Sequence, residues 1–311
     1  MKRIRFACCA LCAFAVAWLA VSSARLSAQE PVPPKPVVPA DSDEAKPEQD
    51  PVAAMQKAFA DAKMQVDVKA QTITLPCVIG QPADPIEFML VHERGKTHEA
   101  LFVTKVKASL LNGAFLLLGY EPGKNARSVE RVPLPTPEEV AKGAPIVDIF
   151  PPEGMKVWFT AKWKRIDDEG NEEAMAAAVE DMILDLATER SIEDIEWIYL
   201  GGNMAPLYRN EPPVFIGDYE GNLASTIYRS PPNHLVTAKH PGADDDERWW
   251  LTEIVPPPGT EVTLTIHRQR PQLVIDRDQR IEKRRSADST EKGKDAADKG
   301  KDAAEPPQTK R

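Results

Sequence analysis

Cysteine is scarce in this chain, and its placement limits the chemistry open to most of the sequence. The 311 residues contain four cysteines, and three of them, Cys8, Cys9 and Cys12, lie at the very start. Cys77 stands alone in the remainder, which therefore can form no internal disulfide and no four-cysteine zinc or iron–sulfur site. The neighbours of Cys77 are apolar, which predicts a buried thiol rather than a reactive one.

The N-terminal segment combines a basic start with an apolar run. Lys2, Arg3 and Arg5 precede an apolar run from Phe6 to about Val21, and small residues close the segment. This order predicts a secretory signal peptide over residues 1–28, cleaved after Ala28, with Ala24 as the competing site. The apolar run is about 16 residues long, whereas spanning a bilayer takes roughly 20. An uncleaved anchor is therefore the less favoured alternative.

The leader sets the expected location and the charge of the mature protein. We expect export to the periplasm or cell envelope, with the membrane as a partner only if the leader is uncleaved. The whole chain has a formal net charge of −9, and the leader contains four basic residues and no acidic one, so its removal leaves −13. An acidic surface repels phosphate groups, which excludes nucleic acid as a general partner.

Catalytic and cofactor motifs of high specificity are also lacking. No Gly-x-Ser-x-Gly nucleophile motif occurs. The segment from Gly119 to Lys124 superficially suggests a phosphate loop, but it lacks the glycine pattern and the Ser or Thr after lysine. A helix end followed by a turn explains it, and we predict no cofactor.

Two stretches without an apolar stripe flank the central region. Residues 29–50 are rich in proline, acid and alanine, and they predict a disordered linker. Residues 276–311 are rich in charged residues and alanine, and they predict a disordered charged tail. The region between them, 51–275, predicts a single β-rich domain with its core at about 65–270.

The central region predicts an α+β fold with a mainly antiparallel sheet and two or three helices, disordered at both ends of the chain. Helices are expected at residues 50–63, 108–118 and, from alanine content, 172–186. The segment Glu93–Lys96 predicts a hairpin connection, with Gly95 free to take a positive φ. Strands are expected at 65–69, 72–78, 85–92, 97–104, 156–165, 197–200, 213–216, 223–228, 249–254 and 262–267.

Several spaced motifs run through the same region. They are Gly95-Lys96-x-His98-Glu99, a leucine-rich helix followed by Glu121-Pro122-Gly123, Trp197-Ile198-Tyr199, and Asp218-Tyr219-Glu220-Gly221. In this combination the chain resembles the YdjY-type domain family of exported proteins. The resemblance implies one continuous module over roughly residues 65–270. It implies no activity, because the family has no established one.

The Lys96-x-His98-Glu99 cluster is the first candidate for chemistry. His98 could serve as a general base or a metal ligand. On an extended strand, however, Lys96 and His98 would point to one face and Glu99 to the other, so His98 and Glu99 should not act together unless a bulge intervenes. The favoured alternative is a structural histidine that is hydrogen-bonded within the sheet.

Further candidates are binding residues. His92 precedes the expected hairpin, and Glu87 and Asp218 are acids within the family-like motifs. Trp249 and Trp250 start a strand, so one ring is expected inside and one outside; Trp250 is the candidate binding contact, and an edge covered by loop is the favoured alternative.

A metal site has little support in the sequence. His92 and His98 would need a distant third ligand such as Asp218, His234 or His240, and no recognisable ligand spacing exists, so no metal is predicted. His234 and His240 flank a proline-rich loop and are expected at the surface. Weak calcium binding at residues 244–247 is an alternative to a solvated acidic loop there.

Two hypotheses of function remain. The favoured one is a non-enzymatic module that binds an envelope protein or a glycan. The alternative is a hydrolase or metal-dependent enzyme that uses Lys96, His98 and Glu99.

Overall fold

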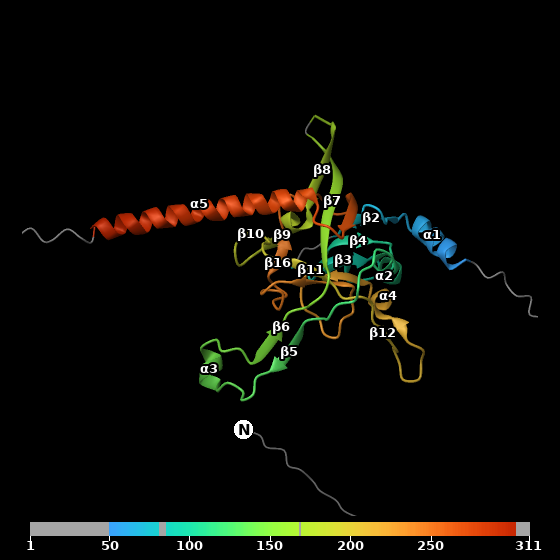
Figure 1. Ribbon diagram of the computed structural model, residues 1–311, viewed down its shortest axis with the longest axis horizontal. Coiled ribbons are helices and arrows are strands. Elements are labelled where there is room, and N and C mark those ends of the chain that lie inside the picture. Colours follow the sequence, from blue (N-terminus) through green and yellow to red (C-terminus); the bar gives the residue numbers. More distant parts are fainter. Residues whose placement is uncertain (1–49, 81–84, 168, 303–311) are drawn as a thin grey trace, which may run out of the picture. The chain divides into compact units, whose positions relative to one another are not determined.

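A computed structural model describes residues 50–80, 85–167 and 169–302. The predicted signal peptide and all but the last residue of the predicted linker lie outside these residues, as does the segment 303–311. The expected fold class is confirmed, since strands dominate and helices are added around them (Figure 1).

Eight strands form a sheet that closes on itself, because β2 and β4 at the two ends of the series also pair with each other. Six of the eight neighbouring pairs are antiparallel, whereas β3–β4 and β14–β15 are parallel. The order around the closed sheet is β2 (Thr72–Ile79), β17 (Glu261–His267), β7 (Lys156–Ile166), β11 (Glu196–Tyr199), β15 (Val236–Lys239), β14 (Asn222–Ser225), β3 (Phe88–His92) and β4 (Ala100–Thr104).

The interior of this sheet is apolar, as the sequence alternation predicts. In β17 the buried residues Val262, Leu264 and Ile266 alternate with more exposed ones. Leu264 lies opposite Leu75 of β2 and Ala161 of β7, and all three are buried. Because successive strand residues face opposite sides, this alternation directs one face of each strand into a common core.

The prediction of a helix at 172–186, which was based on alanine content, is wrong. Residues Glu172–Ala178 form strand β8, which pairs with β7 after the turn that begins at Asp167. A single turn of 3-10 helix, Val179–Met182, and strand β9 (Ile183–Asp185) follow. Cross-strand pairs such as Trp163–Met175 and the burial of Ala177 and Ala178 outweigh the intrinsic helix preference of alanine.

The prediction of a hairpin connection at Glu93–Lys96 is also wrong. Strands β3 and β4 run parallel, so residues 93–99 carry the chain back along the sheet before β4 begins. Gly95 does not take a positive φ. A Cβ at this position would lie only 2.6 Å from the carbonyl oxygen of Gly221, so no larger residue fits there. The glycine therefore allows a close backbone approach rather than a turn.

The remaining elements surround the closed sheet. Two helices were expected close to their observed positions: α1 (Pro51–Asp61) and α2 (Ala108–Leu117), which ends before Gly119 at a φ of 73°. Two shorter helices were not expected, α3 (Pro137–Ala141) and α4 (Ile216–Glu220). The other strands are β1 (Gln65–Asp67), which pairs with β2; β5 (Arg127–Glu130) with β6 (Val147–Phe150); β9 with β10 (Arg190–Ser191) and β16 (Trp249–Leu251); and β12 (Met204–Ala205) with β13 (Val214–Phe215).

The segment expected to begin a solvated tail is instead the start of the longest helix, α5 (Gln272–Asp302) (Figure 1). Arginine side chains attach its first turns to acids of the central region. Arg277 and Arg280 pair with Asp181, which lies just after β8. Arg285 pairs with Glu193 and Asp194, which lie just after β10. The expectation failed because it looked for an apolar stripe, whereas much of this contact is made by ion pairs.

Within residues 50–80, 85–167 and 169–302, no helix combines the length and the hydropathy that crossing a bilayer requires.

Candidate functional site

Three of the predicted site residues lie together in the connection between β3 and β4. Thr97–Glu99 form one turn of 3-10 helix rather than a strand. Lys96 Nζ lies 2.9 Å from Glu99 Oε2, and His98 Nε2 lies 3.2 Å from Glu99 Oε1. The expectation that His98 and Glu99 point apart is therefore wrong, because the turn replaces the strand alternation. The His98 side chain is 73% exposed, so the expectation of a histidine held within the sheet is wrong as well.

Glu87 joins this turn to a second basic residue. Lys96 Nζ lies 3.4 Å from Glu87 Oε2, and the guanidinium of Arg229 forms an ion pair with the same carboxylate. The Arg229 guanidinium carbon also lies 4.6 Å from the centre of the Phe88 ring, a cation–π contact. Arg229, Glu87, Lys96 and Glu99 thus form a chain of alternating charge that begins at a half-buried arginine, and the exposed His98 contacts its last member.

Arg229 and Glu87 open onto a pocket of about 640 Å³, which we call the Arg229 pocket. The loop 228–233 supplies much of its lining, and Asn125 holds this loop by donating a 2.6 Å hydrogen bond to the Arg229 carbonyl oxygen. Its hydrogen-bonding groups include the amides of Asn203 and Asn233. Carboxylates at Glu87, Glu220, Asp244 and Asp246 outnumber the single guanidinium.

Burial perturbs the titrating groups behind this pocket. Burial lowers the pKa of Arg229, while Asp246 acts in the opposite direction. Burial, assisted by the nearby charge of Arg229, lowers the pKa of His234 to about 3. The expectation of a surface His234 is wrong: it is 3% exposed, because the proline-rich loop turns it inward just before β15.

His92 and Asp218 have structural surroundings. His92 is buried at the end of β3, its Nδ1 accepts a hydrogen bond from the Arg94 amide at 3.2 Å, and burial lowers its pKa. Asp218 of α4 accepts hydrogen bonds from the Ser109 amide (2.8 Å) and hydroxyl (2.5 Å). Because Ser109 lies in the first turn of α2, the carboxylate satisfies amide donors at that helix end. Neither residue lines the Arg229 pocket.

The tryptophan pair at β16 has the expected orientation. Trp249 is fully buried, whereas Trp250 is half-buried and donates a hydrogen bond to the Glu247 carbonyl oxygen at 3.0 Å. Trp250 does not line the Arg229 pocket. Cys77 is buried as expected, and burial raises the pKa of its thiol.

Potential metal ligands stay dispersed in the part of the chain that the structure describes. No group of three or more His, Cys, Asp or Glu side chains is arranged there to hold a metal ion. His92 and His98, the two histidines considered from the sequence as a pair of metal ligands, differ in setting, since His92 is buried and His98 is exposed.

Sequence reasoning missed Arg229, Asn233 and Asn203, which lie far from Glu87 in the sequence. The one available signal was the segment Tyr228–Asn233, where aromatic, basic and amide side chains surround two prolines. Such a loop holds polar groups on a stiff backbone, which suits a binding site.

No family model, no curated protein and no solved structure matches this chain. The resemblance to the YdjY-type domain family therefore stays a prediction from the motifs.

Proposed function

We propose that this chain is an exported protein of the periplasm or cell envelope that binds, without chemical conversion, a neutral glycan in the Arg229 pocket. The observation that carries the proposal is the lining of this pocket. Amides, carboxylates and a guanidinium together offer both donors and acceptors, which sugar hydroxyl groups require. The excess of carboxylates disfavours an acidic sugar.

The groups of this pocket that could transfer a proton are its carboxylates, since no histidine, cysteine or lysine lies among the described residues that line it. Glu87 is held by Arg229 and Lys96 rather than kept free for proton transfer. These features support binding over hydrolysis.

The alternative, a hydrolase that uses Lys96, His98 and Glu99, has one observation in its favour. His98 and Glu99 are in contact, as a base and its orienting carboxylate would be. The exposure of His98 argues against it, because a catalytic base usually works in a site that excludes water.

Binding of the mature chain to an array of neutral, amino and acidic glycans would test the proposal. We expect neutral glycans to bind, and the variants Asn233→Ala and Asp246→Asn to weaken binding by about tenfold each. Asp148→Asn, on the exposed strand β6, is the matched control and should bind as the unmodified chain does.

Other outcomes would decide against the proposal. Release of shortened glycans that stops in His98→Ala would establish the hydrolase instead. Capture of an envelope protein without glycan binding would assign the pocket or another surface to a protein partner.

A further inference from the structure

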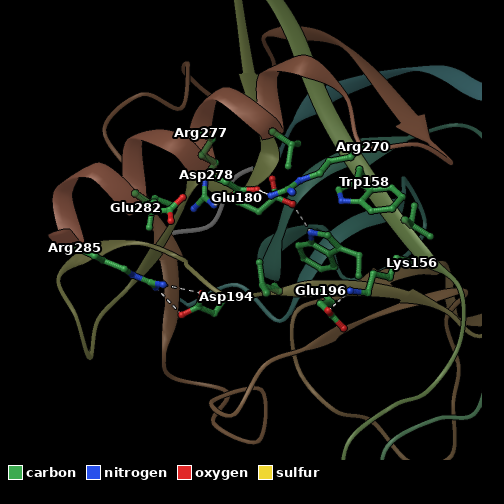
Figure 2. A pocket seen from close by; sticks show the side chains of 15 residues that line it. Lys156, Trp158, Glu180, Asp194, Glu196, Arg270, Arg277, Asp278, Glu282 and Arg285 are labelled. Atoms are coloured by element: carbon green, nitrogen blue, oxygen red, sulfur yellow. Dashed lines mark hydrogen bonds and ion pairs between the residues drawn. The ribbon is translucent and has the colours of Figure 1, made fainter.

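A second pocket of about 640 Å³ lies between the first turns of α5 and the strands β7 and β11. Figure 2 shows Lys156 and Trp158 on the β7 side and Arg277, Asp278, Glu282 and Arg285 along the helix. We call this the α5 cleft. It shares no lining residue with the Arg229 pocket.

The cleft contains a buried carboxyl group that forms no ion pair with any residue that the structure describes. Glu180 is 4% exposed, and its Oε1 accepts a hydrogen bond from Trp197 Nε1 at 2.9 Å. Its Oε2 is buried and receives no hydrogen bond from any residue that the structure describes. Burial raises the pKa of Glu180, and the nearby charge of Arg277 acts in the opposite direction. A buried carboxylate that lacks a donor is costly, so burial favours the protonated acid, and a bound cation would supply the missing donor and favour the anion.

The neighbouring arginine does not supply that donor. Arg277 Nε donates to Asp181 Oδ1 at 2.7 Å, and its Nη2 donates to the carbonyl oxygen of Ile192. Its Nη1 lies 3.7 Å from Asp278 Oδ1. The guanidinium is therefore directed to other oxygens and stabilises Glu180 only through its charge.

The other cations of the cleft are paired as well. Lys156 pairs with Glu196, Arg270 with Asp278, and Arg285 with Glu193 and Asp194. Among the described residues, Glu282 forms no ion pair, so a second carboxylate lines the cleft without a cation. The half-buried indole of Trp158 forms part of the same lining.

We infer that the α5 cleft is a binding site for an organic cation, a primary ammonium or guanidinium group, with Glu180 as the buried anion and Glu282 as the outer one. A cation gains from a desolvated carboxylate and from an aromatic face, and both are offered here. The volume of the cleft lies within the usual range for ligand pockets and has room for spermidine or for one basic side chain. The cation would come either from a free polyamine or from a lysine or arginine of a protein.

Calorimetric titration of the full mature chain with spermidine tests this inference. We expect saturable binding that Glu180→Gln weakens by at least about tenfold, since one charge-assisted hydrogen bond is lost. The substitution keeps an oxygen for the Trp197 hydrogen bond. Glu282→Gln and Trp158→Leu should each weaken binding by about threefold or more.

Two matched controls define the site. Glu172→Gln removes an exposed carboxylate at the far end of the β7–β8 hairpin, and Asn233→Ala alters only the Arg229 pocket; both should leave spermidine affinity unchanged. If Glu180→Gln does not fold, as judged by circular dichroism, Glu282→Gln and Trp158→Leu decide the question.

A second titration identifies the source of the cation. It uses a peptide that contains one lysine and the same peptide with that lysine Nε-acetylated. Stronger binding of the unmodified peptide than of spermidine assigns the cleft to a protein side chain, and the reverse assigns it to a free amine. The inference is overturned if neither probe binds at about 10 mM. It is also overturned if Glu180→Gln binds spermidine as tightly as the unmodified chain does. Should Glu180→Gln fail to fold, unchanged binding by both Glu282→Gln and Trp158→Leu overturns it.

Discussion

The closed sheet and the α5 attachment are held together by different forces. The closed sheet is filled by apolar side chains such as Leu264, Phe159 and Trp197, all almost fully buried. The attachment of α5 places one apolar residue, Val274, deep against the body and half-buries others such as Ile275 and Ile281, and it adds several arginine–carboxylate pairs. Apolar burial is insensitive to salt, whereas partly exposed ion pairs are screened by it. The two regions should therefore respond differently to mutation, pH and ionic strength.

The largest effect is expected in the closed sheet. Leu264→Ala removes a fully buried side chain that lies between β2 and β7, and it should lower the free energy of unfolding by about 2–5 kcal/mol. Urea unfolding followed by circular dichroism measures it. The control Ile166→Ala, at a position that is 61% exposed, should change stability by less than about 1 kcal/mol. A similar loss in both variants would show that the closed sheet is not the main source of stability.

An effect of intermediate size on the free energy of unfolding is expected when low pH protonates His234. Its folded pKa of about 3 lies below the ordinary value of about 6.5, so between these values the unfolded chain binds a proton that the folded chain does not. Stability should therefore fall as the pH drops, by roughly 2 kcal/mol from this group between about pH 6.5 and pH 5. His234→Leu should flatten that part of the stability profile. An unchanged slope in the variant would assign the acid sensitivity to other groups.

The smallest effect is expected at the α5 attachment. Glu193→Gln weakens the pairs with Arg284 and Arg285 and should reduce the local stability of the start of α5 by about 0.5–1 kcal/mol. Hydrogen exchange in residues 277–285 should speed up, and raising salt from about 0.05 to about 0.5 M should do the same in the unmodified chain. Exchange in β17 should not change.

A control variant separates this effect from general charge removal. Glu172→Gln breaks the exposed pair with Lys164 and should leave exchange in α5 unchanged. Salt-insensitive exchange at the start of α5 would mean that its apolar contacts hold it, and the contrast between the two regions would disappear.

Local sequence signals predicted individual elements well where the deciding interactions are local. The helix α2 ends where Gly119 takes a positive φ, and the turn after β7 begins at Asp167, whose side chain accepts from the Asn171 amide at 2.7 Å. The apolar alternation of β17 placed Leu264 in the core. Each of these features depends on residues a few positions apart.

The candidate site was predicted in part. The sequence singled out Glu87, Lys96, His98 and Glu99, and the structure brings them together. It could not supply Arg229, because the contact with Glu87 exists only where β14 pairs with β3. His92, Asp218 and Trp250 were chosen by residue type, and their observed contacts are with nearby backbone groups and, for Asp218, with Ser109.

What the sequence determined by itself is therefore the class of the fold, the burial of Cys77, and the positions of most strands, since hydrophobic periodicity and turn residues act over short spans. Only the tertiary structure decided that the sheet closes, that β3 and β4 run parallel, and that 172–178 is a strand. The burial of His234 and the attachment of α5 belong to the same group. In each of these cases the partner segment is distant along the chain, and the free energy of pairing with it exceeds the local preference of the residues involved.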